Sequence, residues 1–465
     1  MQRFRRIVAA IALAATATTT VAACGGGESE DDSGAKTLKL WHYESENSAM
    51  GVGWNRAIEI FKAEHPGVEV RFERKAFEQI QQNAGMIINS SEGPDIMEYN
   101  KGNATAGLLS SQGLLTDLSA EADKRGWAGK LSPSLQTTAR YSDKGVMGSG
   151  NWFGVPNYGE YVTVYYNKDL FDRNGVKVPT SMAEMTAAMD TFVGKGVTPL
   201  GMAGAEYPAG QLFYQLALSK ADRQFVDNYQ LYKNPVDFKA DPLKYGADTF
   251  AEWVRKGYVA KNSASLKAED MGTAFIAGKT PMIVSGSWWY GRFKTEMKAN
   301  WDTFLFPGNT LNAGSSGNIW VVPSNSKAKS LAYDFIDITL RPEIQDLIGN
   351  NGGVPVAADA SKISDPKDRK LIEDFNTVSK QDGLAFYPDW PVPGYYDVLV
   401  GGFQGLINGS KSPDQVLDTI AKPYADGVKE ITGSTTTRAV DAASNGTITT
   451  SGARNIASRK RTPVT

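Results

Sequence analysis

The order of predicted strands and helices near the N-terminus constrains the fold most. Residues 38–41 alternate apolar and polar side chains as a strand does, and a helical pattern follows until His65-Pro66-Gly67 ends it. The expected elements are strands at 38–41, 68–72 and 94–97 and helices at 54–64 and 79–89. Strands that alternate with helices form a parallel sheet covered on both faces. We therefore expect an α/β fold that binds a ligand beyond the carboxyl ends of its strands.

The length of the chain, 465 residues, is too great for a single hydrophobic core and predicts two or three domains. A hydrophobic fraction of 41% and a charged fraction of 22% are ordinary for a globular protein. The formal net charge is −2, so no basic excess points to nucleic acid.

Cysteine and histidine are too scarce for several kinds of site. Cys24 is the only cysteine, which excludes an internal disulfide and a four-cysteine zinc site. The two histidines, His42 and His65, lie in no recognisable catalytic or metal-binding pattern. Gly278-Lys279-Thr280 resembles the end of a phosphate-binding loop, but position 273 is Thr, and a glycine ending a helix explains the segment better. We expect no catalytic residue, metal or cofactor.

The N-terminus reads as an export signal. Arg3, Arg5 and Arg6 precede an apolar stretch over 7–18 that is too short to span a bilayer. The run Val21-Ala22-Ala23-Cys24 then resembles a lipobox, in which the cysteine is acylated and the chain is cut before it. We expect a signal peptide at 1–23, exported by the Sec route rather than the twin-arginine route, and lipidation at Cys24.

The segments that flank the body have the composition of linkers. Residues 24–36 consist of small and acidic residues with no large apolar side chain after the cysteine, and they predict a flexible tether. Residues 433–465 are rich in Thr, Ser, Ala and Gly and lack aromatic rings, and they predict a disordered tail.

Four stretches of the body together resemble a known family. They are Phe61 to Val68, Gly93 to Ile96, Phe153 to Pro156 followed by Tyr165 to Leu170, and Phe275 to Met282 continued by Gly286-Ser287-Trp288. In this order, and behind a lipobox, they resemble the family-1 extracellular solute-binding proteins, the maltose-binding-protein-like receptors of ABC sugar importers.

The resemblance implies a two-lobed, type II periplasmic-binding-protein-like fold, with a helix-flanked sheet in each lobe and hinge crossovers between them. By this likeness, lobe one comprises residues 38–156 and 305–338, and lobe two comprises 160–302 and 342–431. It also implies a monomer that binds a small saccharide between the lobes and delivers it to membrane permeases.

Sugar binding requires aromatic rings beside polar acceptors, because sugars present C–H faces and hydroxyl groups. The chain has 10 Trp and 19 Tyr, enough for some to serve a binding surface. Strand ends, hinge loops and the family likeness together indicate these ligand-binding candidates: Glu44, Asn47, Tyr99, Asn100, Glu160, Glu206, Tyr207, Trp288, Trp390 and Tyr396. Trp288 and its neighbour Trp289 point in different directions, so we expect one ring in the cleft and one in the core.

Two other functions are compatible with parts of this sequence. A secreted glycosidase also combines rings with carboxylates, but nothing marks the catalytic pair that it needs. A receptor for peptides, polyamines or metals would fit the export signal, yet the aromatic content favours a sugar. We expect a di- or oligosaccharide, N-acetylated forms included, held outside the cell membrane by a lipid-anchored protein.

Overall fold

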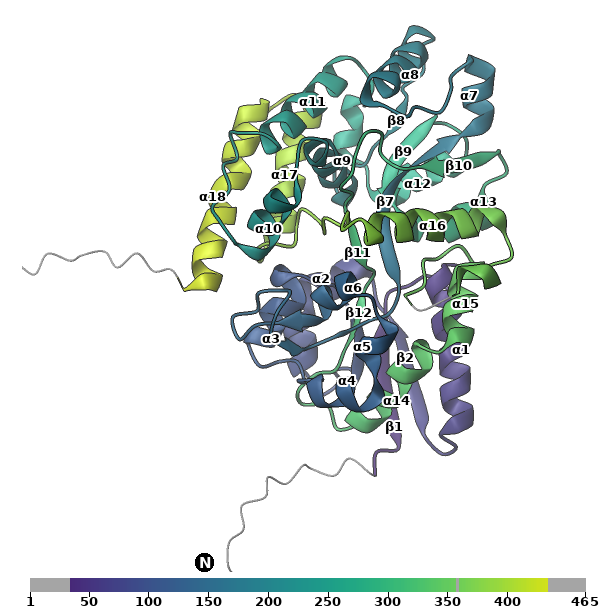
Figure 1. Ribbon diagram of the computed structural model, residues 1–465, viewed down its shortest axis with the longest axis vertical. Coiled ribbons are helices and arrows are strands. Elements are labelled where there is room, and N and C mark those ends of the chain that lie inside the picture. The colour runs from purple at the N-terminus through teal and green to yellow at the C-terminus, as the bar shows by residue number, and fades with distance from the viewer. Residues whose placement is uncertain (1–33, 357–358, 434–465) are drawn as a thin grey trace, which may run out of the picture.

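Two α/β lobes, each with its own sheet, lie one above the other in the computed structural model (Figure 1). The structure describes residues 34–356 and 359–433. The signal peptide, Cys24, most of the tether and the tail after residue 433 lie outside these residues. One helix-flanked sheet in each lobe confirms the predicted fold class.

The sheet of lobe one combines strands from distant parts of the chain. In spatial order its strands are β2 (Glu69–Arg74), β1 (Thr37–His42), β3 (Ile96–Tyr99), β12 (Ile319–Val321) and β6 (Val155–Pro156). The expectation of a parallel sheet is correct only for β1, β2 and β3, since β12 runs antiparallel to both β3 and β6. The reason is topological: β12 enters this sheet from the other lobe rather than through a covering helix.

Helices cover both faces of this sheet. The helical elements of lobe one are α1 (Ala49–Glu64), α2 (Phe77–Asn89), the π-helix η1 (Asn103–Gly107), α3 (Leu108–Ser111), α4 (Ser119–Arg125), α5 (Trp127–Lys130), α6 (Pro133–Gln136), η2 (Thr137–Ala139), α14 (Lys329–Thr339) and α15 (Pro342–Asn350). A two-stranded ribbon joins β4 (Arg140–Tyr141) to β5 (Asn151–Trp152). Helix α1 begins before the expected residue 54 because the Ser48 hydroxyl accepts the Gly51 N–H and caps it.

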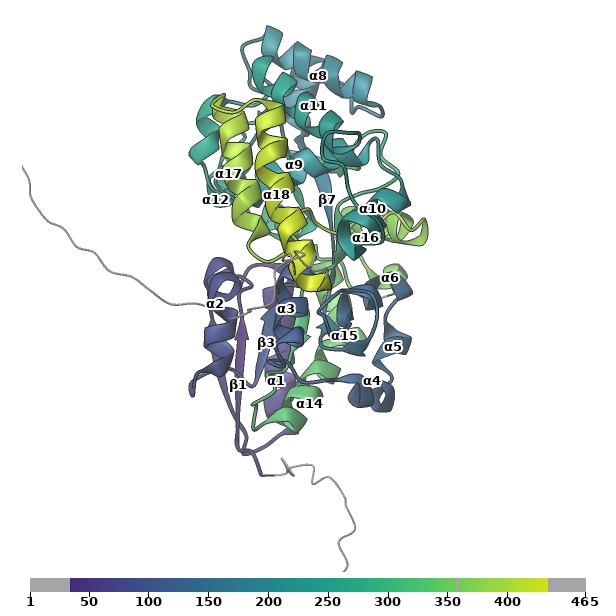
Figure 2. The same cartoon turned by 90° about the vertical axis from the view of Figure 1, so that its left-hand side faces the viewer.

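The side chains of β1 alternate between the two faces. Leu38 and Leu40 belong to the core beneath α1 and α14, whereas Trp41 packs in the core that includes residues of α2. Figure 2 shows α2 on one side of β1 and β3, with α1 and α14 on the other. This packing fixes the strand ends at the edge of the sheet that faces lobe two.

The sheet of lobe two is built around one long strand. In spatial order its strands are β10 (Trp301–Phe304), β7 (Gly159–Asn167), β9 (Met282–Gly286) and β8 (Leu200–Gly201), and β11 (Gly314–Ser316) pairs with the first part of β7. All nine residues of β7 are buried, as expected for a central strand covered on both faces.

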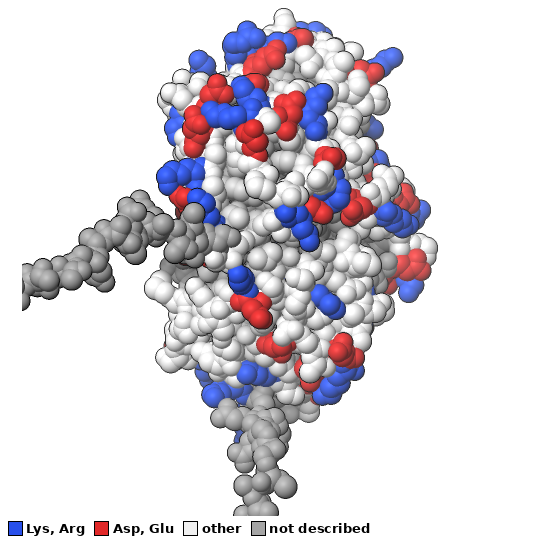
Figure 3. All heavy atoms as spheres, turned by 60° about the vertical axis from the view of Figure 1, so that its left-hand side comes forward, with Lys and Arg blue, Asp and Glu red and all other residues white. Residues whose placement is uncertain are grey.

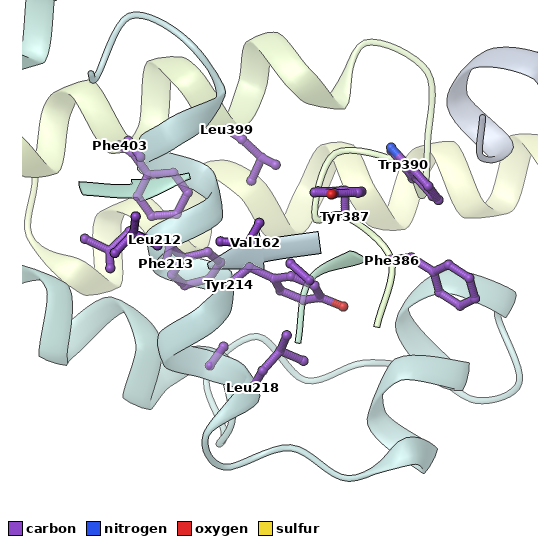
Figure 4. Close-up of a cluster of buried hydrophobic side chains, with 14 of the residues drawn as sticks. Val162, Leu212, Phe213, Tyr214, Leu218, Phe386, Tyr387, Trp390, Leu399 and Phe403 are labelled. Atoms are coloured by element: carbon purple, nitrogen blue, oxygen red, sulfur yellow. The ribbon is translucent and has the colours of Figure 1, made fainter. Parts of the chain in front are cut away.

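The helices of lobe two pack around this sheet. They are α7 (Lys168–Asn174), α8 (Met182–Gly194), α9 (Tyr207–Leu218), α10 (Arg223–Leu231), α11 (Leu243–Arg255), η3 (Lys261–Ser265), α12 (Ala268–Ile276), η4 (Ser287–Trp289), α13 (Tyr290–Glu296), η5 (Ala360–Lys362), α16 (Pro366–Lys380), α17 (Tyr395–Asn408) and α18 (Pro413–Thr432). The ring centroids of Phe213 in α9 and Phe403 in α17 lie 4.5 Å apart in the core drawn in Figure 4. Gly278 follows α12 with φ +67°, which confirms a helix-ending glycine rather than a phosphate loop.

The chain passes between the lobes in three places. It leaves lobe one at Asn157-Tyr158, between β6 and β7, and returns at Gly317-Asn318, between β11 and β12. The third passage follows α15, where the Gly159 N–H donates to the Val354 carbonyl at 2.6 Å. These three neighbouring segments form the hinge.

Two lobe boundaries differ from those expected from the sequence. Residues 305–316 do not belong to lobe one, because β11 pairs with β7 of the second sheet. Residues 342–350 do not belong to lobe two, because α15 packs on α1 of lobe one. In both cases the family likeness placed the crossing several residues from the point where the backbone hydrogen bonds change sheet.

Candidate functional site

A cleft of about 440 Å³ lies where the two lobes meet the hinge. Its lining residues are Tyr43, Glu44, Phe77, Glu78, Asn100, Lys101, Tyr158, Glu160, Glu206, Tyr207, Gln211, Ala268, Glu269, Trp288, Trp289, Asn318, Tyr387, Asp389, Trp390 and Tyr396. Both lobes and two hinge segments contribute, so a molecule in this cleft touches all of them.

Lobe one contributes the loops that follow β1 and β3. Glu44 comes two residues after β1, and its carboxylate accepts the hydroxyl of Ser48 at 3.2 Å. Asn100 and Lys101 come directly after β3. The two strands are neighbours, so their carboxyl ends bring these side chains to one edge of the sheet, where Glu44 and Asn100 were predicted from the sequence.

The hinge contributes Tyr158, whose hydroxyl lies between carboxylates from opposite lobes. It is 3.5 Å from Glu44 Oε1 and 3.4 Å from Glu160 Oε2, and it accepts the Asn318 side-chain amide at 2.9 Å. A phenol has a single proton to donate, so it satisfies one carboxylate at a time. The crossing segments therefore form part of the cleft floor.

A buried ion pair joins the lobes directly. Lys101 Nζ of lobe one lies 2.5 Å from Glu160 Oε1 of β7, and their side chains are 3% and 7% exposed. Lys101 also lies over the rings of Trp390 at 5.0 Å and Tyr387 at 5.6 Å. Removing either charge would leave the other buried without its partner, which is costly.

Lobe two contributes a tryptophan pair that shares one acceptor. The indole N–H groups of Trp288 and Trp289 donate to the Tyr207 hydroxyl at 3.2 and 3.1 Å. Trp288 folds back over Gly286, where a Cβ would lie 1.8 Å from its ring, so only glycine fits there. Trp289 stacks on Phe293 at 5.4 Å and is 7% exposed. Both rings line the cleft, and Trp288 is the more accessible one.

The segment before α17 contributes a third group of rings. Tyr387 lies 5.2 Å from Trp390 and 6.2 Å from Trp288, and Figure 4 shows Tyr387 and Trp390 on this segment beyond Phe386. The Trp390 carbonyl accepts the Ala104 N–H of lobe one at 2.9 Å. This hydrogen bond is a further contact between the lobes.

Burial changes the acidity of the cleft carboxyl groups. Burial, together with the nearby Glu160 carboxylate, raises the pKa of Glu44 to about 7, against the hydrogen bonds from Ser48 and Tyr158. Burial likewise raises the pKa of Asp389 to about 6. Behind them, burial holds the pKa of Glu98 well above its usual range, although Asn157 donates to it at 2.9 Å.

Several polar atoms of the cleft wall have no hydrogen-bond partner among the residues that the structure describes. They are the hydroxyl groups of Tyr43, Tyr387 and Tyr396 and the Oε1 atom of Gln211. Buried polar atoms are almost always satisfied in native proteins, so these atoms are suited to bind a ligand or water.

Eight of the ten candidate residues line the cleft: Glu44, Asn100, Glu160, Glu206, Tyr207, Trp288, Trp390 and Tyr396. Two expected residues do not. Asn47 is exposed in the turn before α1, and Tyr99 is 3% exposed in the core beneath α2 because alternation on β3 turns it away from Asn100.

Sequence reasoning missed other parts of the wall. They are Tyr43, Phe77, Glu78, Lys101, Tyr158, Gln211, Ala268, Glu269, Trp289, Asn318, Tyr387 and Asp389. Lys101 and Tyr387 carried a local signal, since each is adjacent or close to a residue that was identified. Glu78, Gln211 and Asn318 carried none, because only the assembled lobes bring them to the cleft.

Two lobes, three crossings and a polar, ring-lined cleft between them define a binding protein of the two-lobed receptor class. The chain belongs to the bacterial extracellular solute-binding protein family, whose model matches residues 45–346. A probable sugar-binding periplasmic protein of Mesorhizobium japonicum is 26% identical over 332 residues, which cover 68% of this chain and 76% of the relative.

Solved structures share the fold at lower identity. A chitin oligosaccharide binding protein is 20% identical with a TM-score of 0.72, covering 84% of this chain and 99% of its own. A solute-binding protein in complex with raffinose is 18% identical with a TM-score of 0.67, and the match covers 84% of this chain and 99% of the raffinose-binding chain. These likenesses show that the two-lobed fold is shared.

The described residues contain neither a candidate membrane span nor a metal-binding cluster. Within 34–356 and 359–433 no helix is long and apolar enough to cross a membrane. In the same part of the chain no three His, Cys, Asp or Glu side chains gather as a metal site would require.

Proposed function

We propose that this protein captures a small saccharide in the interlobe cleft and delivers it to the membrane permeases of an ABC importer. The observation that carries the proposal is the juxtaposition of Trp288, Tyr387 and Trp390 with Glu44 and Glu160 in one cleft. Rings cover the C–H faces of a sugar while carboxylates accept its hydroxyl groups. The sugar-binding names of the relatives support the same conclusion.

A ligand in this cleft would hold the lobes together. Because lobe one supplies Asn100 and lobe two supplies Trp288, a sugar that touches both favours the closed arrangement. The permeases would then distinguish loaded from empty receptor by that arrangement. Small-angle scattering should show a smaller radius of gyration at saturating sugar, and an unchanged radius would refute closure.

We further propose that the protein acts as a monomer anchored to the outer face of the cell membrane through acylated Cys24. The lipobox and the tether motif support this anchor. A diacylglyceryl group would hold the protein stably where a single chain would not.

Binding without turnover is the remaining part of the proposal. The relatives are binding proteins, and no catalytic pair stands out among the cleft carboxylates. The best-bound sugar, incubated with purified protein, should be recovered intact by chromatography. Turnover that follows the purified protein and disappears with Glu160→Gln would contradict this.

The direct test is a thermal-shift screen over mono- and disaccharides, followed by calorimetry on the best ligand. A bound sugar raises the melting temperature with the logarithm of its concentration over the dissociation constant. Tyr396→Ala should weaken binding, because that half-buried ring lines the cleft with an unpartnered hydroxyl. Tyr245→Ala is the matched control, a half-buried ring of lobe two that lies over Lys220 and outside the cleft. Equal loss in both variants would refute the cleft as the site.

A further inference from the structure

Negative charge dominates the cleft. Six of its lining residues are Asp or Glu and one is Lys, while His and Arg are missing from the lining. Lys101 pairs with Glu160, and Arg292 pairs with Glu269 at 2.7 Å from just outside. On the face shown in Figure 3 acidic and basic side chains are interspersed, so that face does not continue the acidic excess of the cleft.

Two of the remaining carboxyl groups come from different lobes. Glu44 belongs to lobe one and is 9% exposed, and its hydrogen bonds come from the hydroxyls of Ser48 and Tyr158. Asp389 belongs to the segment before α17 in lobe two and is half-buried. Neither forms an ion pair within the described residues. Burial raises the pKa values of both groups, and it outweighs the nearby Lys101 charge, which lowers them.

Independent features of the wall also favour a cation. Gln211 is 4% exposed, lines the cleft and has an unpartnered Oε1 atom, which can accept a hydrogen bond but not donate one. The rings of Trp390 and Tyr387 already lie under the ammonium group of Lys101 at 5.0 and 5.6 Å. Ring faces attract cations through their quadrupole, as the position of Lys101 over these rings illustrates.

We propose that the saccharide selected by this cleft carries a protonated amino group, held between Glu44 and Asp389. The inference rests on the proposed function, since it names the chemical class of the captured sugar. The rings require the C–H faces of a sugar, which distinguishes this ligand from a linear polyamine. An ammonium group would supply a counter-charge and hydrogen-bond donors to these two carboxyl groups.

The test is calorimetry on the purified protein with sugars that differ only at carbon 2. The sets are glucosamine, N-acetylglucosamine and glucose, and the β-1,4-linked disaccharides of the same three units, at pH 7. We expect the amine form to bind at least about tenfold more tightly than either neutral partner, as one charge-assisted hydrogen bond allows. Glu44→Gln and Asp389→Asn should each remove most of that preference.

The matched control is Glu373→Gln, which changes an exposed carboxylate of α16 outside the cleft lining. It should leave the amine preference unchanged. Neutral sugars that bind as tightly as the amines would overturn this inference. So would binding of neutral sugars from the wider panel when both sets fail to bind. Either result leaves the proposed function standing. Failure of every sugar in both experiments would overturn the two together.

Discussion

Replacement of Trp288 by alanine separates a binding role from a structural one. The Trp288 ring is half-buried, packs edge-on against Tyr207 at 5.6 Å and lines the cleft. Stacking of one sugar face on such a ring is worth roughly 1–3 kcal/mol by analogy with bases on aromatic side chains. The dissociation constant should therefore rise by about one to two decades.

The same substitution should cost little stability. It removes one hydrogen bond to the Tyr207 hydroxyl, but the Trp289 N–H still donates there at 3.1 Å. The loss in the free energy of unfolding should therefore be about 1 kcal/mol.

Trp289→Ala provides the contrast within the same turn. That ring is 7% exposed, stacks on Phe293 at an interplanar angle of 15° and has Arg292 over its face at 5.3 Å. Its removal leaves a cavity, so the free energy of unfolding should fall by about 3–5 kcal/mol. Calorimetry with sugar and thermal melting without it measure the two effects separately.

The opposite result in the two variants would refute this assignment of the two rings. A large loss of ligand-free stability in Trp288→Ala, with affinity per folded molecule unchanged, would make Trp288 a core residue. Trp289 would then be the stacking ring.

Three further predictions concern the anchor, the ion pair and the response to pH. Cys24→Ser should abolish incorporation of a clickable fatty acid, and label that persists in this variant would exclude lipidation there. Lys101→Met should lower the free energy of unfolding in urea by about 3–5 kcal/mol because it leaves Glu160 buried and unpaired, and adding Glu160→Gln should recover part of that loss; no recovery would contradict the pairing. Glu44 has a folded-state pKa of about 7, above its unfolded value, so the folded state binds the extra proton and stability falls as pH rises from about 4.5 to 7. The Glu44→Gln variant lacks this pH dependence. Its free energy of unfolding in urea, measured relative to that of the wild type, should therefore rise by on the order of 3 kcal/mol between pH 5 and pH 8, and an equal pH response in both proteins would refute the shift.

Strand-end logic accounts for the part of the site that could be predicted. Glu44 and Asn100 follow neighbouring parallel strands, and Trp288 follows a strand of lobe two, so local sequence order places them at the cleft. Tyr99, the last residue of β3, was predicted to bind ligand but packs in the core. All four residues of β3 are buried, so no alternation of polar and apolar residues marks which of its side chains face the cleft.

The remainder of the site depends on contacts between distant segments. The pairing of Lys101 with Glu160 spans 59 positions and both lobes, and Asn318 reaches Tyr158 across 160 positions. No period or motif encodes such distances. The lobe boundaries were misplaced for a related reason: α15 packs on α1 by shape, which its own sequence does not reveal.

The position of β12 in the first sheet has a consequence for how the chain folds. This strand lies between β3 and β6, yet it is made only after all of β7 to β11. Until residue 321 is available, β3 and β6 have hydrogen-bonding edges with no strand between them. The first lobe therefore cannot complete its sheet during synthesis before the second lobe's strands β7 to β11 have been made. A single cut cannot release either lobe as an independent folding unit, and the rate of folding must depend on pairing over long sequence separations.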